Sequence, residues 1–207
     1  MNESLRIVVV APDLVSDTED EHAAVQATRS RSLRIGLLEN GFNLVATLPP
    51  DVFLAERLAQ LQPDMVIVDA ESDARDALEH VVMATRDERR AIVMFTNDND
   101  STLARDAVAA GVSAYVVAGL STERIRPILD VAMLRFQHEE HLRQELAEAK
   151  SELSGRKLID RAKGLLMQRQ QLTEQQAYDK LRKAAMNKGL KLHEVAQRML
   201  DMADLLG

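Results

Sequence analysis

The chain has 207 residues, no cysteine, 46% hydrophobic and 29% charged residues, and a formal net charge of −7. This composition is typical of a folded protein and excludes collagen-like, disordered and disulfide-stapled chains. Without cysteine there is no thiol nucleophile and no thiolate metal site. The N-terminal sequence has no basic stretch followed by a long apolar core, and no apolar run approaches the roughly 18 residues of a membrane span, so we expect a cytoplasmic protein without membrane contact.

Charge is distributed unevenly along the chain. Residues 151–207 contain 11 Lys and Arg against 7 Asp and Glu, a net charge of +4, whereas residues 1–150 carry a net charge of −11. A basic segment on an acidic protein indicates a polyanionic partner, and the alternative is a solvated helix surface.

The first 120 or so residues alternate apolar, β-branched runs with helical stretches, which is the pattern of a parallel α/β sheet. The runs are nearly continuous in apolar character, as expected for strands covered on both faces. A capping box from Thr18 to Glu21 predicts the start of the first helix, and Gly41 and Gly111 are expected to end helices in a left-handed conformation. The predicted strands of this small doubly wound domain are Ile7–Ala11, Phe42–Thr47, Met65–Ala70, Ile92–Thr96 and Ala114–Ala118.

From Thr122 onward the sequence predicts only helices. A first helix from Glu123 to about Arg169 would be roughly 70 Å long, and Pro127 marks its start or a kink. Apolar residues near a 3-4 spacing predict a coiled-coil seam. A small domain cannot bury so long a stripe, so we expect pairing with a second copy. The seam residues are Ile128, Ala132, Leu142, Leu146, Ala149 and Leu153.

Two shorter helices are expected after the long one. A second capping box begins at Thr173, and Gly189 ends the helix that it opens. The last helix runs from about Leu192 to Leu206 with apolar residues at helical spacing. We expect the apolar stripe of this region to form its core, with Leu181, Ala185, Val195 and Met199 as members.

The α/β part, with its segments PDMVIVDAES, IVMFTN and GVSAY, resembles the flavodoxin-like receiver domain of bacterial response regulators. In that family an aspartate ending the third strand is phosphorylated, and Asp69 stands at that position. Thr96 in the fourth strand and Tyr115 in the fifth also match positions of the pattern. The resemblance therefore implies a phosphorylation pocket at the carboxyl ends of the strands.

Other positions depart from the receiver pattern. Ala11 and Pro12 stand where the family has the acidic pair that holds Mg²⁺, and Asp13 lies one residue beyond. Ala118 stands where the family has lysine. Phosphoryl transfer to a carboxylate needs such cations to offset the charge on the phosphoryl oxygens. We therefore expect a degenerate pocket without metal, in which Asp69 is not used as phosphoacceptor and is a polar residue at an exposed strand end.

The segment RKLIDRAKGLLMQRQQLTEQQAYDKLRKAAMNKGLKLHEVAQRML resembles the ANTAR module of bacterial transcription antiterminators over about 50 residues. The degenerate receiver and this tail together resemble the NasT-like family of nitrate-assimilation antiterminators. The expected fold is α/β followed by all-α. The expected parts are a pseudo-receiver domain over residues 1–122, a coiled-coil linker helix over residues 123–144, and a three-helix ANTAR RNA-binding domain over residues 145–206.

Clustered basic residues in this tail predict RNA binding. Five positive charges fall within the fourteen residues 156–169, and a second group follows on the next helix. Such clusters neutralise phosphates and give salt-dependent binding. Tyr178, the only aromatic residue of residues 151–207, either stacks on an unpaired base or is a core tyrosine. The predicted RNA-binding residues are Arg156, Lys157, Arg161, Lys163, Tyr178, Arg182, Lys183, Lys188 and Lys191.

The sequence contains no motif that indicates an enzyme or a cofactor. It lacks a phosphate loop and a GxGxxG fingerprint, and we expect His138 and His141 to be solvated rather than metal-bound. The resemblance implies an RNA-binding antiterminator of nitrate or nitrite assimilation genes, which acts on leader-transcript stem-loops as a homodimer. It also implies control by a nitrate-sensing, NasS-like partner rather than by phosphorylation. The alternatives are a phosphorylation-switched response regulator with the same RNA-binding output and a dimeric protein-binding adaptor.

Overall fold

The computed structural model describes residues 5–11, 21–69, 74–97, 101–117 and 121–205. The chain forms two compact units, Met1–Glu139 and Glu140–Gly207, which are described separately below. None of the described helices is both long enough and apolar enough to cross a membrane.

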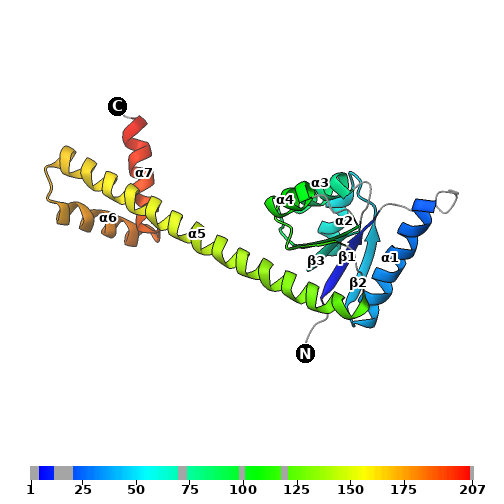
Figure 1. Cartoon of the computed structure of the whole chain (residues 1–207). Helices are drawn as coiled ribbons and strands as arrows, with labels where there is room; N and C mark the ends of the chain where they lie inside the picture. The colour runs from blue at the N-terminus through cyan, green and yellow to red at the C-terminus, as the bar shows by residue number, and fades with distance from the viewer. Residues whose placement is uncertain (1–4, 12–20, 70–73, 98–100, 118–120, 206–207) are drawn as a thin grey trace. The chain divides into compact units, whose positions relative to one another are not determined.

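The N-terminal unit is built on a five-stranded parallel sheet (Figure 1). Its strand order is β2-β1-β3-β4-β5, so the chain winds outward from β1 in both directions, as predicted. The observed strands lie within a residue of the predicted ones, while the predicted last residues Ala70 and Ala118 fall outside the described residues. The strands are β1 (Arg6–Val10), β2 (Asn43–Leu48), β3 (Met65–Asp69), β4 (Ala91–Thr96) and β5 (Ala114–Val117).

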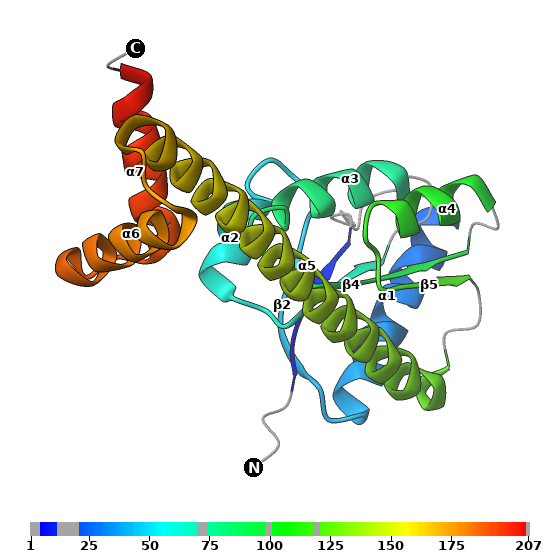
Figure 2. The ribbon, with the colours of Figure 1, turned by 90° about the vertical axis from the view of Figure 1, so that its left-hand side faces the viewer.

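Helices cover both faces of this sheet, which explains why its strands are apolar throughout (Figure 2). One face packs against α2 (Leu54–Leu61), α3 (Ala74–Ala84) and α4 (Ser101–Ala109). The other packs against α1 (Glu21–Glu39) and the first turns of α5 (Thr122–Gln170).

The glycines expected to end helices behave as predicted. Gly41 and Gly111 have φ values of 73° and 95°, in the left-handed region. Gln62 ends α2 with a φ of 46°, a left-handed residue that the sequence does not signal. The capping box expected at Thr18 lies outside the described residues.

The 49-residue helix α5 begins against the end of α1. The side-chain amide of Asn40 donates to the carbonyl of Thr122 at 2.8 Å, and Arg126 donates to the carbonyl of Asn40 and lies 4.9 Å from the Phe42 ring centroid. A Cβ at Gly36 would meet the terminal methyl group of Ile125, which would have to shift, so the glycine lets α5 approach α1 closely. The start of α5 is therefore an integral part of the α/β unit.

Two parts of the predicted seam have different environments. Ile128 and Ala132 pack into the core beneath the sheet, so their assignment to an outward-facing seam is wrong. Leu142, Leu146 and Leu153 are about half exposed. Because α5 begins at Thr122, Pro127 lies inside the helix rather than at its start.

The C-terminal unit consists of the last turns of α5 with α6 (Glu174–Lys188) and α7 (Leu192–Leu205). The predicted capping box is present: Gln176 N–H donates to Thr173 Oγ1 at 3.3 Å, and Thr173 N–H donates to Gln176 Oε1 at 2.9 Å. Gly189 ends α6 with a φ of 62°. The predicted stripe forms the core, in which Leu181, Ala185 and Val195 are buried and Met199 packs against them.

Candidate functional site

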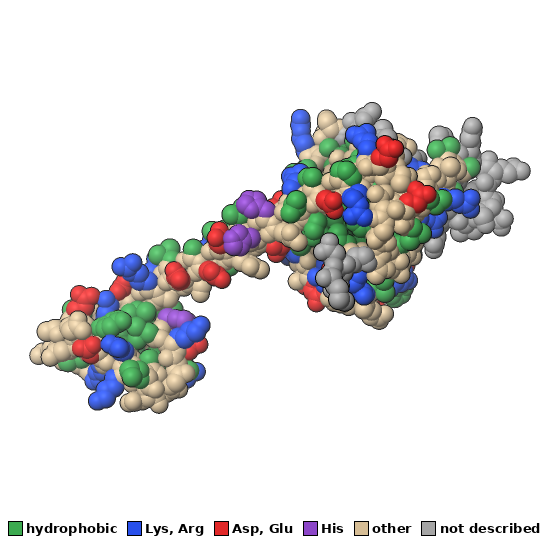
Figure 3. Space-filling model, turned by 90° about the horizontal axis from the view of Figure 1, so that it is seen from below, with side chains coloured by type: hydrophobic (Ala, Val, Ile, Leu, Met, Phe, Trp, Pro, Cys, Tyr) green, Lys and Arg blue, Asp and Glu red, His purple; other side chains and the backbone are tan. Residues whose placement is uncertain are grey.

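Most of the predicted RNA-binding cations lie on the surface of the C-terminal unit. They are distributed over two of its helices and one loop, because α5 carries Arg156, Lys157 and Arg161, α6 carries three more, and Lys191 precedes α7. Figure 3 shows Lys and Arg side chains around apolar side chains on the face of this unit that it presents. The exposed cations are Arg156, Lys157, Arg161, Arg182, Lys183, Lys188 and Lys191.

These exposed cations lack counter-charges among the described residues. In that part of the chain none of the seven forms an ion pair, Arg161, Arg182 and Lys183 included. Exposed cations without internal partners keep their charge available to an external anion.

Lys163 is placed differently from the other predicted cations. Its side chain is only 16% exposed, and its ammonium group lies 2.8 Å from Asp160 Oδ1 and 2.7 Å from Glu174 Oε1. Hydrogen bonds to Asp160 and Glu174 raise the pKa of Lys163, and the hydrogen bond from Lys163 lowers the pKa of Asp160. This side chain therefore joins α5 to the start of α6.

Tyr178 lies on α6 between buried and exposed positions. It is 38% exposed, whereas its neighbours Ala177 and Leu181 are 0% and 2% exposed. Its ring therefore contributes to the surface of the unit one turn before Arg182.

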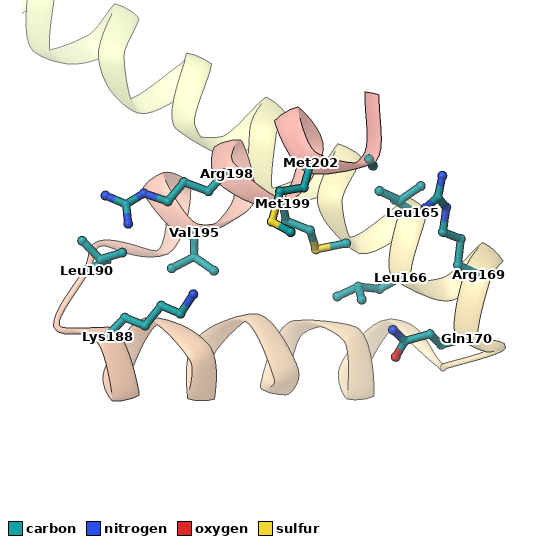
Figure 4. Close-up of a pocket in the computed structure, with 11 residues that line it drawn as sticks. Leu165, Leu166, Arg169, Gln170, Lys188, Leu190, Val195, Arg198, Met199 and Met202 are labelled. Carbon is teal, nitrogen blue, oxygen red and sulfur yellow. The ribbon is translucent and has the colours of Figure 1, made fainter. Parts of the chain in front are cut away.

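The C-terminal unit also contains an open pocket of about 270 Å³ that the sequence did not predict (Figure 4). Its lining comes from all three helices and the loop that follows α6. Arg198 in this lining was not among the predicted RNA-binding residues, although its place between Val195 and Met202 puts a cation beside the apolar stripe. The lining residues are Leu165, Leu166, Arg169, Gln170, Lys188, Leu190, Val195, Arg198, Met199, Met202 and Ala203.

The receiver-like pocket is closed around Asp69 by helix α1. Asp69 is 1% exposed, accepts a hydrogen bond from the hydroxyl of Ser30, and its Oδ1 lies 3.4 Å from Arg29 Nε. The expectation of a polar residue at an exposed strand end is therefore wrong. Burial of this carboxylate is tolerated because a guanidinium and a hydroxyl replace its water.

Of the other residues of the predicted pocket, Thr96 directly follows Phe95, the residue of β4 that pairs with Asp69 in the sheet. Thr96 is buried at the end of β4, and Tyr115 packs against the core on the α2–α4 face, whereas Asp69 contacts α1 on the opposite face. Asp13 lies outside the described residues. Ala11, at a position where receivers carry an acid, packs into the apolar core.

No metal site is evident elsewhere in the described residues. They contain no group of three His, Cys, Asp or Glu side chains that could hold an ion. His138 and His141 are exposed on α5, and His141 Nε2 lies 3.4 Å from Glu145 Oε1.

Comparison with known proteins supports both halves of this description. The ANTAR domain family model matches residues 147–200. The transcriptional regulatory protein PdtaR of Mycobacterium tuberculosis is 31% identical over 191 residues, which cover 92% of this chain and 90% of that protein. The nitrate regulatory protein of Klebsiella oxytoca is 42% identical over 66 residues, which cover 32% of this chain and 17% of that protein.

A solved structure shares the fold of the N-terminal unit. The signal receiver domain of a modulated diguanylate cyclase from Desulfovibrio desulfuricans G20 matches 66% of this chain and 99% of its own, with a TM-score of 0.50 and 14% sequence identity. At this identity the match shows the fold alone.

The fold and the C-terminal module together define a class of response regulators that join a receiver-like α/β domain to an RNA-binding ANTAR module. The chain belongs to this receiver–ANTAR family of transcription regulators, since it aligns with PdtaR over 92% of its length. The family is regulatory, and its RNA-binding output is that of an antiterminator.

Proposed function

We propose that the C-terminal unit binds stem-loops of leader transcripts and thereby prevents termination of transcription. The observation that carries this proposal is the set of exposed cations on α5, α6 and the loop before α7, in the segment that matches the ANTAR family. These cations form no ion pair with any described residue. Arg161 and the neighbouring pair Arg182 and Lys183 supply phosphate contacts, while unpaired loop bases supply selectivity.

The regulated genes are those of nitrate or nitrite assimilation, and a nitrate-sensing, NasS-like partner controls the protein. The 42% identity to the Klebsiella oxytoca nitrate regulatory protein over 66 residues supports the assignment of genes.

Control does not pass through phosphorylation of Asp69. A phosphoryl donor needs access to the carboxylate, and this carboxylate is buried and held by Arg29 and Ser30. The guanidinium also stands close to where a divalent cation would approach, and Ala11 replaces one of the ligands that Mg²⁺ needs. The described residues around Asp69 therefore do not fit Mg²⁺.

The protein acts as a homodimer that pairs through α5. Leu142, Leu146 and Leu153 are about half exposed along this helix, at separations of four and seven residues. A second copy of the same helix would bury these side chains in a coiled-coil seam.

The test is RNA binding by the full chain, measured with hairpins from a pool with randomised loops and with a loop-free duplex of the same stem. We expect preference for looped RNA and an affinity that falls linearly with the logarithm of salt concentration. A chain that binds neither RNA would favour the protein-binding adaptor. Sequencing of RNA that copurifies with the protein from its native cell tests the nitrate assignment, which leaders of unrelated genes would contradict.

Phosphorylation is tested separately by incubation with acetyl phosphate and Mg²⁺ followed by intact mass measurement. We expect no added phosphoryl group. A stoichiometric adduct on Asp69 would favour the phosphorylation-switched regulator.

A further inference from the structure

The pocket of the C-terminal unit combines an apolar interior with cationic margins. Its apolar lining comes mainly from Leu165, Leu166, Val195 and the two methionines of α7. Each helix adds one cation, and no Asp or Glu belongs to the lining. A ligand for this pocket must therefore present an apolar face together with negative charge.

The cations lie at different ends of the pocket. Figure 4 shows Lys188 and Arg198 at one end, Arg169 at the other, and Met199 and Met202 between them. A nucleotide within an RNA strand presents both kinds of group, because its flat base projects from a sugar that is linked to a phosphate on its 5′ side and another on its 3′ side. Methionine side chains are suited to the middle position, since they adapt in shape and their sulfur atoms make favourable contacts with aromatic rings.

The size of the pocket favours one ring system over a peptide. A volume of about 270 Å³ lies just below the range of about 300–1,000 Å³ of pockets for drug-sized ligands. A bound amphipathic helix would need an elongated groove that accepts several successive anchor residues. Here three helices bound a volume that suits one ring system better than several successive anchor residues.

We propose that this pocket receives one unpaired nucleobase of the RNA loop, with the flanking phosphates on Arg169 at one end and on Lys188 and Arg198 at the other. This inference rests on the proposed function, and it adds a base-reading site separate from Tyr178, which is not part of the lining. Phosphate contacts alone carry no sequence information, whereas a base held in a shaped pocket does.

The experiment starts from a hairpin selected by the full chain out of a randomised-loop pool. Each loop nucleotide of that hairpin is made abasic in turn, which removes the base and keeps the phosphates. We expect one position at which base removal lowers affinity about tenfold, the effect of losing one stacked base. The same abasic substitution should have little effect on the variant Met202→Gln.

A matched variant controls for changes at the surface. Met202 is 63% exposed and lines the pocket, whereas Met186 is 73% exposed on α6 outside it. Because both methionines are exposed, replacing either with glutamine should not affect folding. The abasic hairpins should lose as much affinity for Met186→Gln as for the unchanged chain. The two variants also assign the methyl signals of Met202 and Met186 in a chain labelled at its methionine methyl groups.

On the native chain we expect the selected hairpin to shift the Met202 methyl signal and the one critical abasic hairpin to leave it in place. Equal abasic effects in the native chain and Met202→Gln, with no Met202 shift, would overturn the pocket assignment while leaving RNA binding intact. Failure to select any hairpin would overturn the proposed function itself. A Met202 shift caused by an acidic amphipathic peptide, but not by the hairpin, would assign the pocket to a protein partner and overturn the inference.

Discussion

The two units of the chain differ in the burial and pairing of their charged side chains. In the α/β unit, the residue that corresponds to a phosphoacceptor is buried and bound by Arg29 and Ser30 of the same unit. In the C-terminal unit, Arg161 and Arg182 are exposed, and the described residues offer them no ion-pair partner. The first unit has the receiver fold with the corresponding aspartate enclosed, and the second presents exposed cations to solvent.

Replacement of Arg29, the cation that pairs with the buried Asp69, should give the largest loss of stability. Arg29→Met leaves the Asp69 carboxylate buried without its guanidinium, so we expect the α/β unit to lose about 3 kcal/mol in its free energy of unfolding. Urea denaturation followed by circular dichroism measures this loss. The double variant Arg29→Met with Asp69→Leu should recover most of the stability, because it removes both charges together. A single variant as stable as the native chain would contradict a closed, paired pocket.

The long helix α5 contains both buried and half-exposed leucines, so the two environments can be compared within one element. Leu129 is fully buried against the sheet, whereas Leu146 and Leu153 are half exposed. Lysine at both Leu146 and Leu153 should weaken self-association at least about a hundredfold and leave the helical content unchanged, since each paired leucine contributes about 1.5–3 kcal/mol. Sedimentation velocity separates dimer from monomer. Leu129→Lys should instead unfold the α/β unit, and a native chain that sediments as a monomer at high concentration would contradict pairing.

Two neighbouring cations of α5, Arg161 and Lys163, should differ in how their replacement changes the salt dependence of RNA binding. Arg161→Gln removes an exposed charge, so the slope of log affinity against log salt should fall by about one. Lys163→Gln should leave that slope nearly unchanged and lower the thermal stability of the C-terminal unit, because this ammonium group is engaged with Asp160 and Glu174. Titrations at several salt concentrations measure the slope.

A control that removes two positive charges, one more than Arg161→Gln, comes from the α/β unit. Arg86 and Arg105 are exposed there, and their double replacement by glutamine should leave the salt slope unchanged. If this control lowers the slope as much as Arg161→Gln does, the basic surface of the C-terminal unit is not where RNA binds.

The smallest expected effect is a pH dependence of the ion pair between Asp160 and Lys163 on α5. Lys163 lowers the pKa of Asp160, so the stabilisation from this carboxylate is present at neutral pH and is lost as the pH falls through that pKa. The pKa of Lys163 is raised, so its own contribution is lost only as the pH rises through that value. Thermal unfolding of the native chain and Lys163→Met should differ slightly at pH 7 and converge in acid. A difference that grows in acid would contradict this assignment.

The sequence predicted the elements of the fold because their causes are local. Apolar runs specify buried strands, and the capping box at Thr173 specifies where α6 begins. The burial of Asp69 depends on Ser30, which is 39 residues away on a helix whose rotation is fixed only by packing. The role of Lys163 depends likewise on Glu174 across a turn, and the pocket exists only where three helices meet.

The pairing of Asp69 with Arg29 also affects how genetic tests of this protein should be interpreted. Response regulators are commonly probed by replacing the phosphoacceptor with asparagine to block the switch or with glutamate to imitate its active state. In this chain, asparagine would leave the buried guanidinium without its counter-charge, and glutamate would insert an extra methylene group into a filled site. Either allele would change the abundance of folded protein, so a phenotype would report protein quality control rather than signalling.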